Sequence, residues 1–132
     1  MSTQEAENCA VTAGKFCWNE LVTRDIAGLQ KFYARMFGWK EEAFGPDYTL
    51  FKNPGDKADD RAVGGMISMP TAPATGWLPY VIVEDCDASV RRAKELGAKI
   101  AVEAKDIPKV GRIAVIVDPQ GAAIGIITPK PE

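Results

Sequence analysis

Apolar and polar residues follow two periods along this chain, and the two periods occur twice in the same order. Residues 16–22 are mostly apolar, as in a strand, and apolar residues then recur every three to four positions over 26–36, as on one face of a helix. Residues 77–83 repeat the strand pattern and residues 90–96 repeat the helical spacing. The pattern therefore predicts two units that each begin with a strand and a helix.

Each predicted helix has the same start and stop signals. Asp25 precedes the first helix and Asp85 precedes the second, where a carboxylate accepts hydrogen bonds from free backbone N–H groups. Gly38 and Gly97 follow, and glycine commonly ends a helix in the left-handed conformation. The two units are offset by 60 residues, which we interpret as a tandem duplication. The alternative is a chance match within an ordinary α/β chain.

Turn residues and apolar runs complete the predicted elements. The first unit is predicted as strands near 16–23, 39–44, 47–53 and 62–69 with a helix at 25–37, and the second as strands near 77–83, 99–104, 111–117 and 122–128 with a helix at 86–96. The sequence Asp118-Pro119-Gln120-Gly121 predicts a tight turn between the last two strands. We expect a flexible tail at 1–14 and one domain at 15–132, divided into module one at 15–70, a linker at 71–76 and module two at 77–129.

Length and charge limit the possible functions. With 132 residues, of which 46% are hydrophobic, the chain can bury one core, so two half-units must share it. Its 16 basic and 18 acidic residues give a net charge of −2 and form no basic stripe, so we expect no nucleic-acid partner. No apolar run approaches the roughly 20 residues that span a bilayer, and no signal peptide is visible, so we expect a cytoplasmic protein without a membrane partner.

The reactive residue types are few. Histidine is absent, which excludes serine–histidine and cysteine–histidine nucleophiles and removes the commonest ligand of transition metals. The glycine pair at 64–65 lies inside an apolar run and not in a phosphate-binding loop, so no cofactor is expected. The three cysteines have no metal-ligand spacing, and Cys86 is flanked by acidic residues that oppose a reactive thiolate.

One carboxylate occurs in an apolar strand. Alternation places Trp18, Glu20 and Val22 on the same face of the first strand. Glu20 is either a charge that points to water or pairs with a cation, or a buried acid that takes up a proton or holds a cationic ligand. Tyr80 lies 60 residues later, so Glu20 and Tyr80 are the tentative catalytic pair.

Aromatic residues suggest the lining of a ligand site. Trp18, Tyr48, Phe51 and Trp77 all lie in or next to predicted strands, where they either line an apolar site or fill the core. Arg112 begins a strand and either holds an anionic ligand or is exposed.

The paired units resemble the vicinal oxygen chelate superfamily, which contains glyoxalase I, bleomycin-resistance proteins and extradiol dioxygenases. The resemblance covers about residues 15–129. It is carried by Glu20-Leu21-Val22-Thr23-Arg24-Asp25, Phe32-Tyr33 and Phe37-Gly38-Trp39 in the first half, and by Tyr80-Val81-Ile82-Val83-Glu84-Asp85, Leu96-Gly97-Ala98 and Asp118-Pro119-Gln120-Gly121 in the second. It implies an α+β fold of two tandem βαβββ modules that form an incomplete mixed-sheet barrel.

The resemblance also implies a cup that holds the ligand, and a homodimer. Metal-binding members of the superfamily carry ligands on the first and last strands of each module, and these places fall on Trp18, Gly65, Leu78 and Gly125. None of these side chains coordinates a cation, so we expect no metal, and we expect the glycines to leave volume for an organic ligand. The predicted ligand-binding residues are Trp18, Glu20, Val22, Tyr48, Gly65, Leu78, Tyr80 and Gly125.

Four functions remain open from the sequence. The first is a metal-independent protein that binds an apolar or aromatic small molecule in the cup between its modules. The second is a metal-free lyase, isomerase or hydroxylase-like enzyme that uses Glu20 as acid or base. The third is an enzyme whose metal is held by unusual ligands, and the fourth is an interaction partner with a closed cup.

Overall fold

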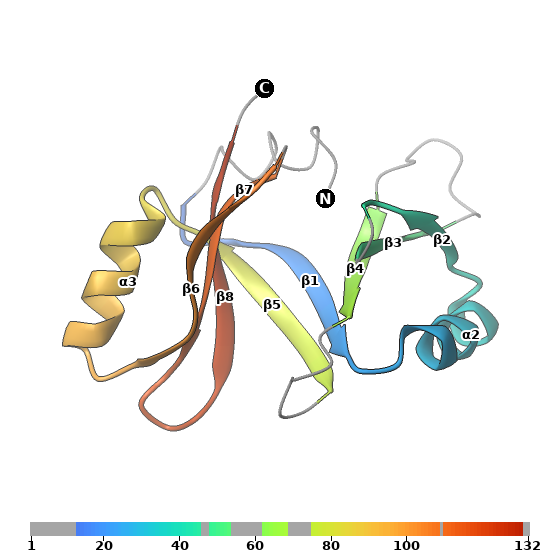
Figure 1. The fold of residues 1–132 in the computed structure, drawn as a ribbon, viewed down its shortest axis with the longest axis horizontal. Coiled ribbons are helices and arrows are strands. Elements are labelled where there is room, and N and C mark those ends of the chain that lie inside the picture. Colours follow the sequence, from blue (N-terminus) through green and yellow to red (C-terminus); the bar gives the residue numbers. More distant parts are fainter. Residues whose placement is uncertain (1–12, 46–47, 54–61, 69–74, 109, 131–132) are drawn as a thin grey trace. The chain divides into compact units, whose positions relative to one another are not determined.

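The computed structural model describes residues 13–45, 48–53, 62–68, 75–108 and 110–130. Within these residues helices and strands follow one another as the hydropathy pattern predicts (Figure 1). The elements in chain order are β1 (Phe16–Thr23), α2 (Ile26–Phe37), β2 (Lys40–Ala43), β3 (Tyr48–Lys52), β4 (Ala62–Ser68), β5 (Gly76–Ile82), α3 (Cys86–Glu95), β6 (Lys99–Ile107), β7 (Gly111–Val117) and β8 (Ala123–Pro129).

The predicted fold class, α+β with two tandem βαβββ modules, is confirmed. The hydrogen-bonded order of the described strands is β2-β3-β4-β1-β5-β8-β7-β6, and the sheet is not closed into a barrel. β1 pairs with β4 and β5 pairs with β8 in parallel, whereas the pairs β2–β3, β3–β4, β6–β7 and β7–β8 are antiparallel. The sheet is therefore mixed, and each module repeats the same strand pairing.

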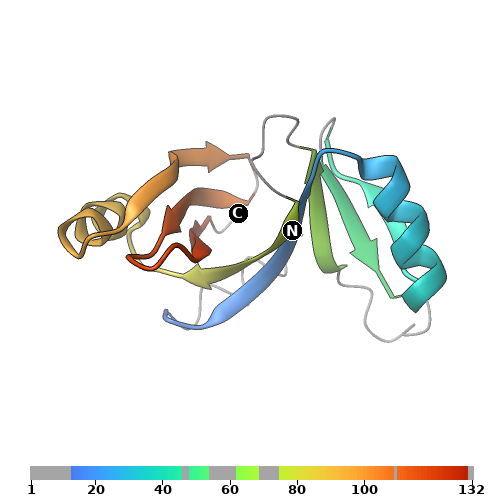
Figure 2. The same cartoon turned by 90° about the horizontal axis from the view of Figure 1, so that it is seen from below.

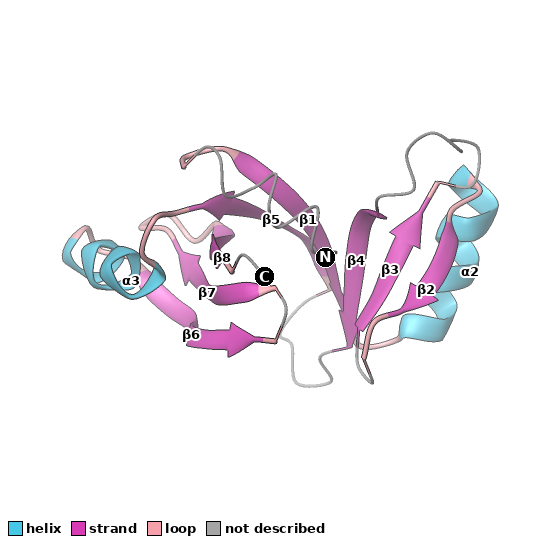
Figure 3. Cartoon of the chain, turned by 90° about the horizontal axis from the view of Figure 1, so that it is seen from above, coloured by secondary structure: helices cyan, strands magenta, loops and turns pink. Residues whose placement is uncertain are grey.

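The chain divides into two compact units. The first runs from Asn19 to Trp77, and the second contains Leu78 onward together with the segment that ends at Trp18. In the first unit α2 covers one face of β2, β3 and β4 (Figure 3). Its core consists of Leu21, Phe51 and Met66, against which Ile26, Leu29, Tyr33 and Trp39 of the α2 region pack.

Capping fixes both ends of α2. The Asp25 side chain accepts a hydrogen bond from the Gly28 N–H at 3.2 Å, and the Asp25 N–H donates to the Thr23 hydroxyl at 3.0 Å. Gly38 ends the helix at φ 72°, a left-handed conformation that residues with a side chain rarely adopt. The capping residues predicted from the sequence are confirmed.

The second unit repeats this plan with α3 against β6, β7 and β8 (Figures 1 and 2). Asp85 caps α3 by accepting from the Ala88 N–H at 3.1 Å, and Gly97 follows the helix at φ 93°. The core under α3 consists of Cys86, Val90, Ala114 and Ile126.

The last two strands of the second unit form the predicted hairpin. The Gly121 N–H donates to the Asp118 carbonyl at 3.0 Å, and the Asp118 carboxylate accepts from the N–H groups of Gln120 and Ala122. These backbone donors hold the pKa of Asp118 below its usual range. β6 extends three residues further than predicted, to Ile107, and its register against β7 shifts twice.

Several sequence predictions concern residues outside the described ranges. Most of the tail at 1–14 and of the linker at 71–76 lies there, as does Cys9. In the described part of the chain, neither helix combines the length and the apolar character needed to cross a bilayer.

Candidate functional site

The first unit carries Glu20 on the face of the sheet that points away from α2. Leu21 and Met66 are register partners on β1 and β4 and pack toward α2. Glu20 and Gly65 are partners one position earlier, so alternation turns them to the opposite face. The Glu20 residue is only 8% exposed. The sequence-based alternative of a charge that points to water is therefore wrong.

Tyr48 of β3 lies over Gly65 of β4. Tyr48 pairs with Ile67, two residues beyond Gly65, so Tyr48 and Gly65 are diagonal neighbours on one face of the sheet. A Cβ atom added to Gly65 would overlap the hydroxyl oxygen and Cε1 of Tyr48 and lie 2.5 Å from Cζ. The hydroxyl end of this ring thus occupies the place where a side chain on Gly65 would begin.

Tyr80 covers Gly125 in the second unit. Tyr80 of β5 and Gly125 of β8 are register partners in a parallel pair, and the Tyr80 residue is only 4% exposed. A Cβ atom added to Gly125 would lie 2.5 Å from Cδ2, 2.6 Å from Cε2 and 2.7 Å from Cγ of Tyr80. Here the body of the ring, and not its hydroxyl end, covers the glycine.

One expectation about the glycines is wrong. The sequence predicts empty volume at Gly65 and Gly125, but a tyrosine ring fills the space above each of them. The register pairs Gly65 with Glu20 and Gly125 with Tyr80, and this pairing depends on the partner strand.

The eight predicted ligand-binding residues divide between the two units. Glu20, Val22, Tyr48 and Gly65 belong to the first unit. The strand register brings them together on the face of its sheet that points away from α2, which we call the helix-distal face. The second unit contains the other four, of which Tyr80 and Gly125 are direct strand partners. These four are Trp18, Leu78, Tyr80 and Gly125, and all are buried.

Two other predicted aromatic residues lie on the helix side of the first unit. Phe51 is part of the core under α2, and its ring centroid is 6.1 Å from that of Tyr33. The Trp77 Nε1–H donates to the Tyr33 hydroxyl at 3.1 Å, and the two rings are edge to face at 5.5 Å. For Phe51 the core alternative is the correct one, because its side chain packs toward α2.

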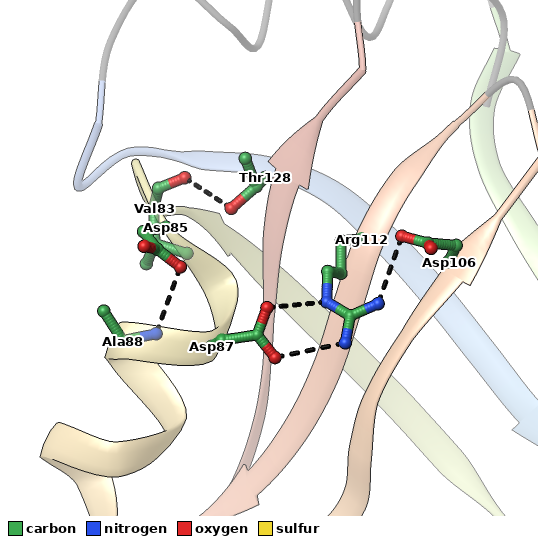
Figure 4. A network of polar contacts seen from close by, with 7 residues as sticks. All are labelled: Val83, Asp85, Asp87, Ala88, Asp106, Arg112 and Thr128. Carbon is green, nitrogen blue, oxygen red and sulfur yellow. Dashed lines mark hydrogen bonds and ion pairs between the residues drawn. The ribbon is translucent and has the colours of Figure 1, made fainter.

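Arg112 is held by carboxylates of its own unit (Figure 4). Its guanidinium donates to both oxygens of Asp87 on α3, with Nε–Oδ2 at 2.8 Å and Nη2–Oδ1 at 3.1 Å, and its Nη1 lies 3.2 Å from Asp106 Oδ1. The hydrogen bonds from Arg112 lower the pKa of Asp87, and those to Asp87 and Asp106 raise the pKa of Arg112. Arg112 therefore ties α3 to β7. The sequence shows no signal for this pairing.

Cys86 is a core residue. Its side chain is buried under α3, and burial, followed by the charge of Asp87, raises the pKa of the thiol to about 11. A neutral thiol is a poor nucleophile, so Cys86 does not form a reactive site.

The described residues do not fit a divalent cation. They contain no group of three or more Cys, Asp or Glu side chains placed to hold a metal ion. In the first unit, the face that points away from α2 carries the buried carboxylate of Glu20 on β1, Gly65 on β4 and the phenol of Tyr48 on β3. In the second unit, Tyr80 on β5 pairs with Gly125 on β8. Cation sites need several converging anionic or imidazole groups, and the described residues of neither unit supply them.

The family of this chain follows from comparison with known proteins. The model of the Glyoxalase-like domain matches residues 16–127, which include every helix and nearly every strand described above. The chain belongs to the glyoxalase-like family. The resemblance to the vicinal oxygen chelate superfamily inferred from the sequence is thus confirmed.

Two named relatives are similar over most of this glyoxalase-like chain. CFP32 of Mycobacterium bovis, named as a candidate glyoxylase, is 37% identical over 125 residues, which are 90% of this chain and 46% of CFP32. The anthracycline biosynthesis protein DauV of Streptomyces sp. is 36% identical over 119 residues, which are 86% of this chain and 41% of DauV. The chain thus spans less than half the length of either relative.

Solved structures share the fold at low sequence identity. A glyoxalase/bleomycin resistance protein/dioxygenase superfamily member from Vibrio splendidus superposes with a TM-score of 0.57 at 17% identity, covering 86% of this chain and 97% of that one. Methylmalonyl-CoA epimerase from Mycobacterium tuberculosis gives 0.56 at 18% identity, with 90% of each chain covered. These structures support the glyoxalase-like fold alone. The chemistry has to be inferred from the residues of this chain.

Proposed function

We propose that this glyoxalase-like protein binds an apolar or aromatic small molecule without a metal ion, on the face of the first unit that points away from α2 and carries Glu20. The observation that carries the proposal is the filling of both glycine positions by tyrosine rings. The resemblance assigns metal ligands to these last-strand positions, and in this chain aromatic rings lie there in place of carboxylate or imidazole side chains.

The surroundings of the two tyrosines support an organic ligand. The helix-distal faces hold Leu50 beside Gly65 and Ile127 beside Gly125, and both side chains are buried. Mostly apolar walls with a few polar groups are typical of small-molecule sites. The name of DauV adds support for an aromatic ligand, since anthracyclines are polycyclic aromatic ketones.

Binding of an aromatic ketone to metal-free protein tests the proposal. The protein is dialysed against EDTA and titrated with 2-acetylnaphthalene, followed by calorimetry and by quenching of tryptophan fluorescence. We expect one site with a micromolar or lower Kd that added Mn²⁺ or Zn²⁺ leaves unchanged. Binding that appears only after a divalent cation is added would contradict metal independence, and no binding in either state would contradict the ligand class.

The second candidate function is a metal-free enzyme in which Glu20 acts as acid or base. The burial of Glu20 favours it, because a carboxylate withdrawn from water is suited to proton transfer. In that case Glu20→Gln abolishes turnover while the Kd for 2-acetylnaphthalene changes by no more than a few-fold. Unchanged turnover of any substrate found for the wild type would remove Glu20 from the mechanism.

A homodimer and a cytoplasmic location complete the proposal. Both come from the sequence and its family resemblance. Phe32, Met36 and Phe37 of α2 are more than half exposed in the single chain, which supports self-association. Light scattering coupled to size exclusion, with wild type at micromolar concentration, distinguishes a dimer from a monomer of 14.3 kDa.

A further inference from the structure

We propose that the outer side of α2 is the surface through which two copies of this chain associate, with the two α2 helices packed antiparallel. This inference rests on the homodimer of the proposed function and adds its interface. The surface is formed by Phe32, Met36 and Phe37, which we call the α2 patch, and these residues are 53%, 57% and 53% exposed. No described element of the first unit covers this side of the helix (Figure 3).

The α2 patch is continuous and rests on the core of the first unit. Phe32 and Met36 are four positions apart, so they are neighbours on one side of the helix. Phe32 and Phe37 both contact the ring of Tyr33, with ring centroids at 5.1 Å and 6.0 Å. Tyr33 in turn packs against the core residue Phe51. Side chains that are already packed on one side lose less conformational freedom on association, which suits an interface.

The matching helix of the second unit shows that the module does not require this patch. The residue 60 positions after Phe32 is Arg92 on α3, which forms an ion pair with Glu95 at 3.1 Å. Met36 has an exposed apolar counterpart in Leu96. Every residue of α2 is at least partly exposed, whereas α3 buries three of its own. An exposed phenylalanine where the fold accepts a charged residue indicates a contact outside the unit.

A second copy of this chain fits the α2 patch. A two-fold interface brings the same surface of both copies together, so that surface must complement itself. Apolar side chains do so, because they pack against one another without like charges meeting. The basic residues Lys31 and Arg35 lie on the flank of the helix that points away from Met36 and Phe37, so they border the patch and do not interrupt it.

The ends of α2 also suit an antiparallel pair. Arg24 precedes the helix and Glu41 follows it, and both are exposed. Antiparallel packing brings the start of each helix to the end of the other, so opposite charges lie at each end and the helix dipoles are opposed. A stable dimer buries about 800 Å² per partner, so the α2 patch is the apolar centre and these charges belong to the polar rim.

The lengths of the named relatives support the same partner. CFP32 and DauV are each more than twice as long as the segment that matches this chain, so each contains further chain that can cover such a surface. For this chain of 132 residues, a second copy supplies a comparable length.

Two matched variants test the interface. Met36→Glu places a charge in the α2 patch, and Leu96→Glu places the same charge at the corresponding exposed position of α3. Sedimentation equilibrium from micromolar to millimolar concentration measures the Kd of the dimer. We expect Met36→Glu to weaken dimerisation by at least roughly tenfold, because its charge becomes buried without a partner at the centre of the interface. Leu96→Glu should dimerise as the wild type does.

Oxidation of Met36 locates the contact directly. Dilute hydrogen peroxide converts accessible methionine to the sulfoxide. Met36 is exposed in the single chain, so it should be oxidised quickly below the Kd of the dimer and slowly above it. Met66, which is 0% exposed, should be oxidised slowly at both concentrations and serves as the control.

The outcomes separate this inference from the proposed function. If the wild type is a dimer and Met36→Glu dimerises equally well, the interface lies elsewhere, so the inference is wrong and the homodimer stands. If the wild type is a monomer at millimolar concentration, the homodimer and the inference both fail, and the metal-free binding of a small molecule is unaffected. A monomer that binds phosphatidylserine vesicles and loses this binding in Met36→Glu would assign the patch to a membrane surface and overturn the inference. Thermal unfolding checks that both variants are folded.

Discussion

The hydroxyl end of Tyr48 lies directly over Gly65, in the place where any other residue would begin its side chain. The contact joins β3 to β4 on the face away from α2, and it sets the phenol next to Glu20, the strand partner of Gly65. The packing of this face thus depends on the absence of one methyl group.

Gly65→Ala should destabilise the protein. The added Cβ overlaps the Tyr48 ring, so the ring must move or the strands must separate, and overpacking of this kind costs about 1–3 kcal/mol in the free energy of unfolding. Urea denaturation followed by circular dichroism measures the change.

Gly76→Ala is the matched control for this substitution. A Cβ on Gly76 meets no atom within 4 Å among the described residues. Gly76 is the first residue of β5, and its φ is not in the left-handed region. We expect a change within about 0.5 kcal/mol for this exposed position. Equal stabilities of Gly65→Ala and Gly76→Ala would show that Tyr48 is not packed over Gly65.

The fold could be predicted because its signals are local. Asp25 and Asp85 mark the starts of the two helices, and Gly38 and Gly97 mark their ends. The strands outside the helices are predicted from their apolar residues. Every predicted helix and strand is present within a few residues of its predicted bounds. The largest difference, the extension of β6 to Ile107, comes from pairing with β7, which the local pattern does not contain.

The contacts of the candidate site could not be predicted to the same extent. Alternation correctly placed Glu20 on one face of β1, but its neighbour across the strands depends on the β1–β4 register. The position of the Tyr48 ring over Gly65 depends in addition on the β3–β4 register. The ion pair of Arg112 with Asp87 joins a strand to a helix 25 residues away, and no sequence spacing indicates it.

Asp87→Asn should make the stability of the protein less dependent on pH in the acid range. Arg112 lowers the pKa of Asp87 in the folded protein, below the ordinary value of 3.8. The ion pair therefore contributes stability that is fully present above about pH 4 and is lost as the pH falls through the lowered pKa. We expect Asp87→Asn to have a lower Tm than wild type at pH 7 and a smaller further decrease between pH 5 and pH 2. Differential scanning fluorimetry in steps of pH measures both.

Asp106→Asn is the control for the ion pair. Its contact with Arg112 is single, 3.2 Å long and made by a side chain that is 80% exposed, whereas Asp87 binds Arg112 through both oxygens. Exposed single ion pairs contribute little, so the Tm at pH 7 should fall less than in Asp87→Asn. A larger fall in Tm for Asp106→Asn than for Asp87→Asn would show that the Asp106 contact stabilises the protein more than the Asp87 contact does.

Cys86 should resist alkylation in the native protein. With a pKa of about 11, roughly one thiol in a thousand is ionised at pH 8, and burial also blocks access. Treatment with iodoacetamide followed by peptide mass spectrometry should modify the half-buried Cys17 well before Cys86, and urea should remove the difference. Modification of Cys86 at the rate of Cys17 in native protein would mean that α3 opens readily or that the thiol is activated.

Removing divalent cations should change neither the stability nor the ligand affinity of the protein. A cation held only by the folded state raises the Tm in proportion to the logarithm of its concentration over its Kd, so a real metal site would be visible as a shift on adding metal. Protein purified without chelator should contain less than about a tenth of an equivalent of metal by elemental analysis, and its Tm should be the same in EDTA and in millimolar Mn²⁺ or Zn²⁺. A stoichiometric metal that is lost in Glu20→Gln would show that Glu20 is a metal ligand and would replace the proposed binder with the metal-dependent enzyme.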